Sequence, residues 1–331
     1  MPADATIYVA GHRGLVGSAI LRHLQGQGYR NLVTRTHAEL DLTRQAAVEA
    51  FFERERPAYV FLAAARVGGI LANSTQPAEF LYDNLAIQTN VLQAAWKSKV
   101  QRLLFLGSSC IYPRNAPQPL KEEYLLTGEL EPSNEPYAVA KIAGLKMCEA
   151  YNRQYGTQFI AVMPTNLYGP NDNFDLETSH VIPALIRKFH EAVSKGADEV
   201  VVWGTGAPRR EFLYVDDLAD ACGFLMNLPS GTIDRDFRQP NQPVFINVGT
   251  GKDMTIGELA ETIAAISGFR GRIRFDPSKP DGTPRKILDL SRLRALDWRP
   301  KVPLTEGIRK VRDWYAGESH RFTGKETDRV S

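Results

Sequence analysis

The stretch that decides the fold class is Thr6-Ile7-Tyr8-Val9-Ala10-Gly11-His12-Arg13-Gly14-Leu15-Val16-Gly17, near the beginning of the chain. A short β-prone run ends at Gly11, and the apolar residues that follow Gly17 recur at helical spacing. Glycines between a strand and a helix let the chain turn sharply, let the backbone approach a pyrophosphate and let the helix pack closely. The spacing therefore predicts a dinucleotide-binding unit, although glycines also occur in ordinary turns between a strand and a helix.

The rest of the first half alternates short apolar runs with helical patterns, which is typical of a parallel sheet covered by helices. Further strands are expected at 32–33, 59–63, 103–106 and 159–163, and long helices over 78–97 and 137–155. After Pro164 prolines become frequent and short strands alternate with small helices. We therefore expect an α/β fold with a doubly wound parallel (Rossmann) sheet and a smaller mixed α/β substrate-binding domain. The expected division is 1–166 with about 212–250 for the first domain, and 167–211 with 251–331 for the second.

The composition excludes several classes of protein. The chain has 331 residues, 43% of them hydrophobic, and a formal net charge of +2, so its overall charge attracts neither nucleic acid nor anionic lipid. Its apolar runs are shorter than the roughly 18 residues that a membrane helix needs. Cys110, Cys148 and Cys222 are too far apart for a disulfide framework or a metal site. We expect a cytoplasmic protein with no metal, membrane or nucleic-acid partner.

The end of the predicted second strand indicates which dinucleotide is bound. A site for NAD usually places a carboxylate there, against the ribose hydroxyls. Here the strand ends in Thr34-Arg35-Thr36, and Arg13 lies in the glycine loop. Two guanidinium groups suit the 2′-phosphate of NADP, unless both arginines are simply solvated. The sequence therefore favours NADP(H) as the cofactor.

Tyr137 and Lys141 lie four residues apart in a predicted helix, so their side chains share one face. We expect the ammonium to lower the pKa of the phenol, so that the pair exchanges a proton with a carbinol or carbonyl oxygen. Ser108 follows a predicted strand, at the edge where open α/β sheets form their sites. A glycine loop, a serine at a strand end and a Tyr-x-x-x-Lys pair are hard to obtain by chance in this order.

In these residues the chain resembles the extended short-chain dehydrogenase/reductase family, whose members act mostly on nucleotide sugars. The resemblance implies that Ser108, Tyr137 and Lys141 form the catalytic triad and that Lys141 also contacts the nicotinamide ribose. It further implies a homodimer that pairs through the two long helices. By resemblance, the cofactor site comprises Gly11, His12, Arg13, Gly14, Leu15, Val16, Gly17, Arg35, Asp41, Leu106, Gly107, Lys141, Pro164, Thr165, Asn166, Leu167 and His180.

Two further residues narrow the expected chemistry. Cys110 stands where the related 4,6-dehydratases carry a glutamate, and a thiol can act on carbon as an acid or base if its surroundings shift its pKa. His180 follows the polar stretch 166–173, whose glycine and proline are typical of a site rim. Taken alone, a cysteine after a strand is more often a small buried filler, and a single histidine is usually structural.

Together these segments resemble the family of GDP-L-fucose synthases over nearly the whole chain. The resemblance rests on four stretches: Gly11–Gly14, Ser108–Pro113, Met163–Pro170 and Lys279–Lys286. It implies NADPH-dependent 3,5-epimerisation and 4-reduction of GDP-4-keto-6-deoxy-D-mannose to GDP-L-fucose. In that family the cysteine and the histidine form the acid/base pair, which makes Cys110 the expected base and His180 the expected acid.

The expected substrate site lies in the second half of the chain. Arg210 begins an R-x-F-x-x-V-D-D stretch like that of the wider family, in which the arginine holds the substrate pyrophosphate. Asp216 and Asp217 at its end are expected to cap the next helix. The resemblance adds three substrate contacts: Lys188, Trp203 and Asp281. Two alternatives stay open, namely another nucleotide-sugar 4-epimerase or 4-reductase of this family, and an NADP-sensing protein without catalysis.

Overall fold

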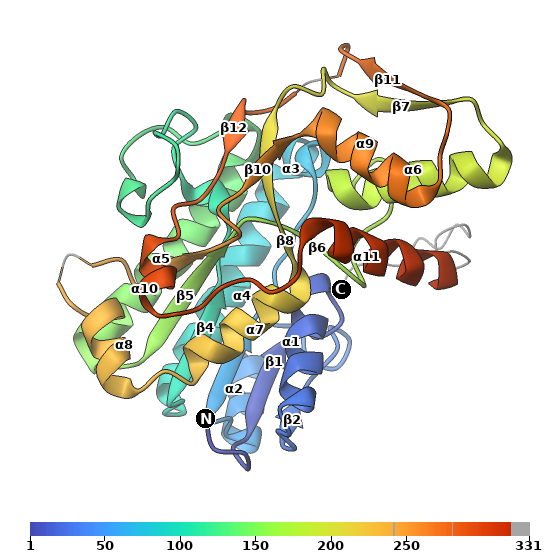
Figure 1. Ribbon diagram of the computed structural model, residues 1–331. Helices are drawn as coiled ribbons and strands as arrows, with labels where there is room; N and C mark the ends of the chain where they lie inside the picture. The colour runs from blue at the N-terminus through green and yellow to red at the C-terminus, as the bar shows by residue number, and fades with distance from the viewer. Residues whose placement is uncertain (241, 280, 319–331) are drawn as a thin grey trace.

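In the computed structural model, which describes residues 1–240, 242–279 and 281–318, a six-stranded parallel sheet forms the centre of the molecule (Figure 1). The strands lie in the order β2-β1-β3-β4-β5-β9. Their bounds are β1 Ile7–Ala10, β2 Leu32–Val33, β3 Tyr59–Leu62, β4 Arg102–Leu106, β5 Phe159–Pro164 and β9 Phe245–Val248. Because β2 and β3 lie on opposite sides of β1, the strand order reverses there, and the carboxyl end of β1 is where an open sheet binds its ligand.

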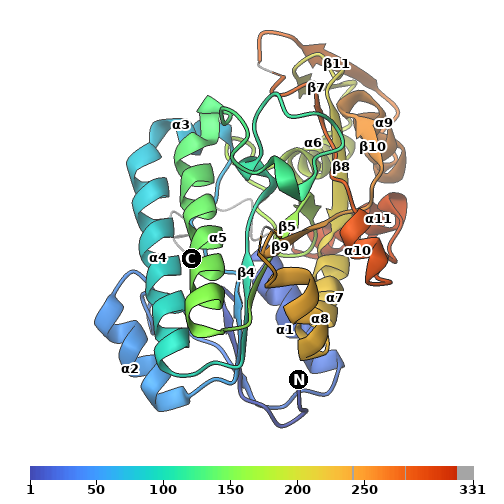
Figure 2. The same cartoon turned by 90° about the vertical axis from the view of Figure 1, so that its left-hand side faces the viewer.

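Helices cover both faces of this sheet, with α2, α4 and α5 on one face and α1, α7 and α8 on the other (Figure 2). Alternate residues of β1 point to opposite faces of the sheet. Tyr8 packs into the apolar core beneath α2, α4 and α5 (the first core), and Val9 packs into the apolar core beneath α1, α7 and α8 (the second core). The bounds are α1 Leu15–Gly26, α2 Gln45–Glu55, α4 Pro77–Lys97, α5 Glu135–Tyr155, α7 Val215–Met226 and α8 Ser230–Phe237. The short helices α3 and α10 span Ile70–Thr75 and Ser291–Ala295. The predicted doubly wound parallel sheet is confirmed.

A smaller mixed α/β layer lies beyond one end of the central sheet (Figure 1). It contains a sheet of β6, β8, β10 and β12 and a separate pair of β7 and β11, packed against α6, α9 and α11 around a third apolar core. The strands are β6 Asn166–Tyr168, β7 Glu199–Trp203, β8 Arg209–Tyr214, β10 Asp253–Thr255, β11 Arg272–Asp276 and β12 Arg285–Lys286. The helices are α6 Val181–Lys195, α9 Ile256–Ser267 and α11 Leu304–Glu318. In the part of the chain described, every helix is too short or too polar to cross a bilayer.

A buried carboxylate ties this layer to the central sheet. Glu211 on β8 is fully buried, and its Oε1 accepts hydrogen bonds from the backbone N–H of Thr250 at 2.6 Å and of Gly251 at 2.7 Å. Its Oε2 accepts from the N–H of Leu288 at 2.8 Å. One side chain therefore joins β8, the loop after β9 and the segment after β12. Burial raises the pKa of Glu211, and these three N–H donors act against that rise.

We predict that Glu211→Ala lowers the free energy of unfolding by about 3 kcal/mol or more, because it leaves three buried N–H groups without acceptors. Glu261→Ala, which removes an exposed carboxylate from α9, is the matched control and is expected to change stability by less than about 0.5 kcal/mol. Urea denaturation followed by circular dichroism gives both values. Equal midpoints for the two variants would contradict the role of Glu211.

Candidate active site

The predicted catalytic triad gathers at the carboxyl end of β4. Lys141 on α5 is almost fully buried, and its Nζ donates a 2.8 Å hydrogen bond to the carbonyl oxygen of Leu106, the last residue of β4. The same Nζ lies 5.7 Å from the ring centroid of Tyr137. Ser108 follows two residues after the strand, and its Oγ accepts a hydrogen bond from the backbone N–H of Cys110 at 3.4 Å. The structure thus brings Ser108, Tyr137, Lys141 and Cys110 together.

The expectation that Lys141 lowers the pKa of Tyr137 is wrong. Burial and the neighbouring Cys110 raise the pKa of the phenol well above its ordinary value, while a hydrogen bond with Ser108 lowers it only in part. Burial also lowers the pKa of Lys141 to about 8. Helical spacing shows that two groups share a face but not how far they are removed from water, and here burial dominates.

Cys110 and His180 come from different parts of the fold. Cys110 lies in the short turn η1, Ser109–Ile111, and is 7% exposed, whereas His180 is the residue before the first turn of α6. Burial raises the pKa of the Cys110 thiol, and the charge of Lys286 is the first of several effects that oppose the rise. His180 is exposed, and desolvation of its ring and the charge of Lys286 both lower its pKa. Both groups therefore lie within the electrostatic reach of Lys286.

The glycine loop lies where the strand order reverses. Gly11 has a φ of +81°, and a side-chain carbon there would lie 2.8 Å from the backbone of Ala64. At Gly17 such a carbon would lie 2.0 Å from the carbonyl oxygen of Gly11. Gly14 precedes the first turn of α1, so no side chain caps the N–H groups of that turn. Nδ1 of His12 is buried and has no hydrogen-bond partner among the residues that the structure describes. The loop therefore leaves free donors and close backbone space, as a dinucleotide pyrophosphate requires.

The two arginines predicted to select NADP differ in exposure and in their hydrogen bonds. Arg13 is exposed, whereas the guanidinium of Arg35 donates to Glu55 Oε1 at 2.6 Å and to the carbonyl oxygen of Thr34 at 2.7 Å. Hydrogen bonds from Thr36 lower the pKa of the exposed Glu39, and the charges of Arg35 and Arg13 lower it further, so both arginines lie near this carboxylate. Arg13 therefore keeps the freer guanidinium for an anion.

The other predicted cofactor residues line the strand ends or support them. Asp41 Oδ1 accepts from the N–H and hydroxyl of Thr43, which places its carboxylate at the turn before α2. The side chains of Thr165 and Asn166 both donate to the carbonyl oxygen of Glu211, at 3.1 and 2.8 Å. The remaining ones lie at the carboxyl ends of β4 and β5, at the start of α1 or in β6: Leu106, Gly107, Pro164, Leu15, Val16 and Leu167.

The predicted substrate contacts form a second group around β7 and β8. Lys188 Nζ lies 5.1 Å from the ring centroid of Trp203, which is 50% exposed, and also donates to the carbonyl oxygen of Val201 at 2.9 Å. Asp281 accepts two 2.7 Å hydrogen bonds from Thr205, so its carboxylate is already engaged. Burial lowers the pKa of Arg210, and the charge of Asp281 opposes this.

The carboxylates after β8 do not cap α7, because no side chain caps that helix. Asp217 instead accepts from the backbone N–H of Lys301 and Val302, and Asp216 pairs with Arg22 at 2.7 Å. Asp216 therefore joins α7 to α1, and Asp217 joins α7 to the segment before α11. The sequence interpretation was right that they are structural and wrong about the contact.

Sequence reasoning missed Lys286, although it is the last residue of the quoted stretch Lys279–Lys286. A second missed residue of this stretch is Lys279, whose Nζ lies 5.2 Å from the ring of Trp203. A stretch rich in proline and lysine has no periodicity that indicates which side chains point into a site.

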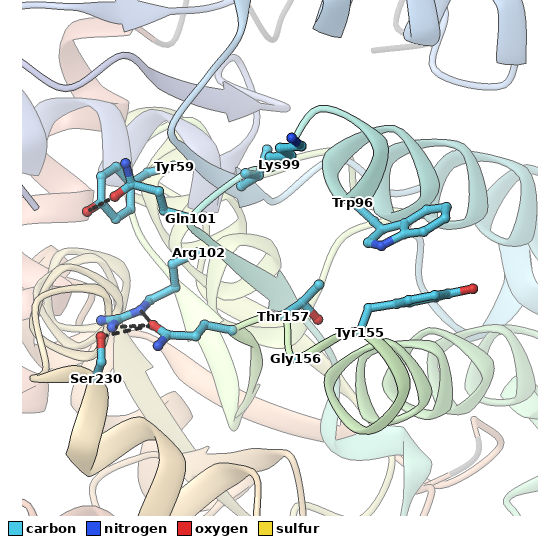
Figure 3. A pocket seen from close by; sticks show the side chains of 11 residues that line it. Tyr59, Trp96, Lys99, Gln101, Arg102, Tyr155, Gly156, Thr157 and Ser230 are labelled. Carbon is cyan, nitrogen blue, oxygen red and sulfur yellow. Dashed lines mark hydrogen bonds between the residues drawn. The ribbon is translucent and has the colours of Figure 1, made fainter.

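A hollow of about 480 Å³ lies at the amino ends of β3 and β4, and Figure 3 shows residues that line it. Tyr59 and Arg102, the first residues of β3 and β4, line it together with the stacked rings of Trp96 and Tyr155. The Arg102 guanidinium donates to Gln158 and to two backbone carbonyl oxygens, so its charge is already engaged. Open α/β sheets bind ligands at the carboxyl ends of their strands, so this hollow is not the active site.

A parallel sheet with a glycine loop at its switch point and a Ser-Tyr-Lys group at a neighbouring strand end defines an NAD(P)-dependent enzyme of the short-chain dehydrogenase/reductase type. The chain belongs to the NAD dependent epimerase/dehydratase family, whose profile matches residues 7–237.

Individual relatives narrow this class. The chain is 60% identical to GDP-L-fucose synthase 1 of Arabidopsis thaliana, over 94% of this chain and 93% of that protein. It is 54% identical to the GDP-L-fucose synthase of Escherichia coli strain K12, over 96% of this chain and 98% of that protein. Among solved structures, a GDP-D-glycero-L-gluco-heptose synthase from Campylobacter jejuni, determined in the presence of NADPH, superimposes with a TM-score of 0.89 at 41% identity, covering 96% and 99% of the two chains.

We predict that Gly17→Ala weakens NADPH binding by about tenfold or more, equivalent to roughly 1.4 kcal/mol, because the new methyl group displaces the Gly11 carbonyl. Gly26→Ala at the other end of α1 is the control, since a side-chain carbon there meets no atom within 4 Å. Quenching of protein fluorescence by NADPH measures both affinities. Wild-type affinity in Gly17→Ala would show that the loop does not approach the cofactor.

Proposed function

We propose that this protein is an NADPH-dependent enzyme that epimerises GDP-4-keto-6-deoxy-D-mannose at C3 and C5 and then reduces C4, giving GDP-L-fucose. The observation that carries the proposal is the position of Cys110, whose backbone N–H is bound to Ser108 Oγ at 3.4 Å beside the Tyr137 and Lys141 group, together with His180 immediately before α6. A simple 4-epimerase or 4-reductase needs the tyrosine group alone. The relatives named GDP-L-fucose synthase support the same substrate.

The epimerisation follows from the acidity of the carbon atoms beside a ketone. The C4 carbonyl makes the protons on C3 and C5 acidic, and inversion needs a base on one face and an acid on the other. In our proposal Cys110 takes the proton, the C–H electron pair moves to the C4 oxygen, and His180 delivers a proton to the same carbon from the opposite face. Ser108 and Tyr137 donate hydrogen bonds to the C4 oxygen while it carries negative charge.

The reduction uses the same tyrosine. When bound, NADPH supplies the hydride that C4 accepts. Burial raises the pKa of Tyr137 and so favours the protonated phenol, which holds the proton that the C4 oxygen needs. Lys141 lies between Tyr137 and the carbonyl of Leu106, where its ammonium stabilises the phenolate left after proton transfer.

The glycine loop, His12 and the β4 and β5 ends would hold the cofactor, and Arg13 would bind its 2′-phosphate. We assign residues 1–166 with about 212–250 to the cofactor and 167–211 with 251–331 to the substrate; 319–331 lie outside the described residues. Arg210 would hold the substrate pyrophosphate, and the Trp203 face beside Lys188 and Lys279 would contact the nucleotide.

We further propose a homodimer that pairs through α4 and α5, since Tyr82 on α4 and Val139 on α5 are 67% and 42% exposed. The three cysteines are free and buried, which suits the reducing cytoplasm in which we place the enzyme.

The direct test is to add GDP-4-keto-6-deoxy-D-mannose and NADPH, follow the loss of NADPH absorbance and identify the product by NMR. Formation of GDP-L-fucose is the expected result. The heptose relative favours a second candidate, reduction of a different GDP-4-keto sugar. Consumption of a GDP-4-keto-heptose, without consumption of GDP-4-keto-6-deoxy-D-mannose, would support this second candidate. NADPH binding with no turnover of either sugar would point instead to a sensor.

We predict that Cys110→Ala and His180→Asn each slow exchange of the C3 and C5 protons with solvent by about 10²–10⁴-fold, since each removes an acid or base from the reaction. NADPH affinity is expected to stay at the wild-type value in Cys110→Ala. Cys222→Ala, which removes a fully buried thiol from the second core, is the control. Deuterium incorporation measured by NMR reports the exchange, and unimpaired incorporation in either variant would remove that residue from the mechanism.

We predict that Arg13→Ala weakens NADPH binding by about 10- to 100-fold and leaves NADH binding unchanged, because it removes one charge-assisted hydrogen bond to the 2′-phosphate. Arg30→Ala removes an exposed guanidinium from the loop before β2 and serves as control. Titration with each nucleotide measures the preference. Equal losses for NADPH and NADH would show that Arg13 does not contact the 2′-phosphate.

A further inference from the structure

Phe80, near the start of α4, packs against the tyrosine of the catalytic group. Its side chain is 2% exposed, and its ring meets the Tyr137 ring edge to face, with centroids 6.4 Å apart and planes at 82°. This is a favoured arrangement of two aromatic rings. On α5, Lys141 Nζ lies 5.7 Å from the centroid of the same Tyr137 ring. Contacts from α4 as well as α5 therefore restrain the phenol.

The Phe80 ring is itself held by the loop between β3 and α3. A side-chain carbon at Gly68 would lie 3.0 Å from Phe80 Cζ, so the glycine lets the loop come this close to the ring. The guanidinium carbon of Arg66 lies 5.6 Å from the Phe80 centroid, within the range of a cation–π contact. Arg66 is fixed in turn, because its guanidinium donates to Asp83 at 2.8 Å and to Gln76 at 2.5 Å. The ring therefore contacts this loop as well as Tyr137.

Asn84 fastens the same loop to α4. Its side chain is 2% exposed, and its Oδ1 accepts a hydrogen bond from the N–H of Arg66 at 3.0 Å. Its Nδ2 donates to the carbonyl oxygens of Arg66 at 3.0 Å and of Phe80 at 2.7 Å. Earlier in the loop, the backbone of Ala64 lies 2.8 Å from the place that a side-chain carbon of Gly11 would take. The loop therefore runs from the glycine loop of the proposed cofactor site to Phe80.

We propose that Phe80 is a positioning residue for the reduction, whose ring directs the Tyr137 hydroxyl toward the C4 oxygen. The proposal rests on the proposed function for its substrate. As hydride adds to C4, the electron pair of the C=O bond moves to the oxygen, which takes the Tyr137 proton and leaves a phenolate. Proton transfer requires the two oxygens at hydrogen-bond distance, so a small rotation of the ring slows it. Lys141 stabilises the phenolate, whereas Phe80 sets the plane of its ring.

The first test separates an effect on chemistry from an effect on folding. In Phe80→Leu we expect kcat for the reduction to fall by about 10- to 100-fold, because the phenol loses its restraint. The KM for the sugar and the affinity for NADPH are expected to stay within about twofold of the wild-type values. Equal kcat values in Phe80→Leu and the control below, or a change confined to KM, would overturn the proposal.

Phe237→Leu is the matched control. Phe237 is also 2% exposed, and the guanidinium carbon of Arg292 lies 5.6 Å from its ring centroid, so its surroundings resemble those of Phe80. It belongs to the second core, on the face of the sheet opposite α4 and α5. The two substitutions remove the same atoms from similar surroundings, and only one of them takes a ring away from Tyr137.

A second variant keeps the Phe80 ring and displaces it. In Gly68→Ala the new methyl group presses on Phe80 Cζ, so we expect kcat to fall by about tenfold. When Gly68→Ala is combined with Phe80→Leu, kcat is expected to fall no further than in Phe80→Leu alone, because both changes act through one ring. Losses that multiply in the double variant would contradict this.

A third measurement needs no substrate. In crystal structures of the variants, we expect the Tyr137 ring to rotate out of its wild-type plane in Phe80→Leu and to keep that plane in Phe237→Leu. A ring that stays in place in Phe80→Leu would overturn the proposal. If wild-type protein reduces no GDP-4-keto sugar, the proposed function fails, and these crystal structures alone decide whether Phe80 orients Tyr137.

Discussion

The arrangement of the site depends on the buried carboxylate of Glu211. Its two oxygens bind the backbone at Thr250, Gly251 and Leu288, and its carbonyl oxygen accepts hydrogen bonds from Thr165 and Asn166. One residue of β8 therefore fixes the last strand of the central sheet, the end of β5 and the segment that carries Lys286. Because a buried carboxylate is stable only when its hydrogen bonds are satisfied, these segments keep their mutual positions or the fold loses stability.

Burial also sets the resting state of the reacting groups. It raises the pKa of Tyr137 and Cys110 and lowers that of Lys141, so in each case it favours the neutral form. Groups shifted in opposite directions within one site are typical of acid/base catalysis. The ionic forms that the proposed mechanism uses then need stabilisation from nearby charges, and the charges of Lys286 and Lys141 both lower the pKa of Cys110.

Much of the fold follows from local sequence patterns. Local spacing of glycines and apolar residues predicts the glycine loop, the alternation of strands and helices and the two long helices. The predicted bounds lie within about two residues of the observed ones. Helix α8 was missed because Ser230–Phe237 is polar and brings only Ile233 and Phe237 into the core.

The electrostatics of the site could not be read from the sequence. Sequence spacing placed Tyr137 and Lys141 on one face, but the sign of the Tyr137 shift depends on burial by distant segments. Trp203 and Lys188 would pass for a core residue and a solvated residue without the resemblance, whereas the structure places the ammonium against a half-exposed ring.

The most direct test of the account is the isotope content of the product made in D₂O. With NADPH and GDP-4-keto-6-deoxy-D-mannose, we predict GDP-L-fucose that carries one solvent deuterium at C3 and one at C5, with the C4 hydrogen derived from NADPH. A reduced sugar with no deuterium at C3 and C5 would show that the site reduces without epimerising and would contradict the assignment of Cys110 and His180.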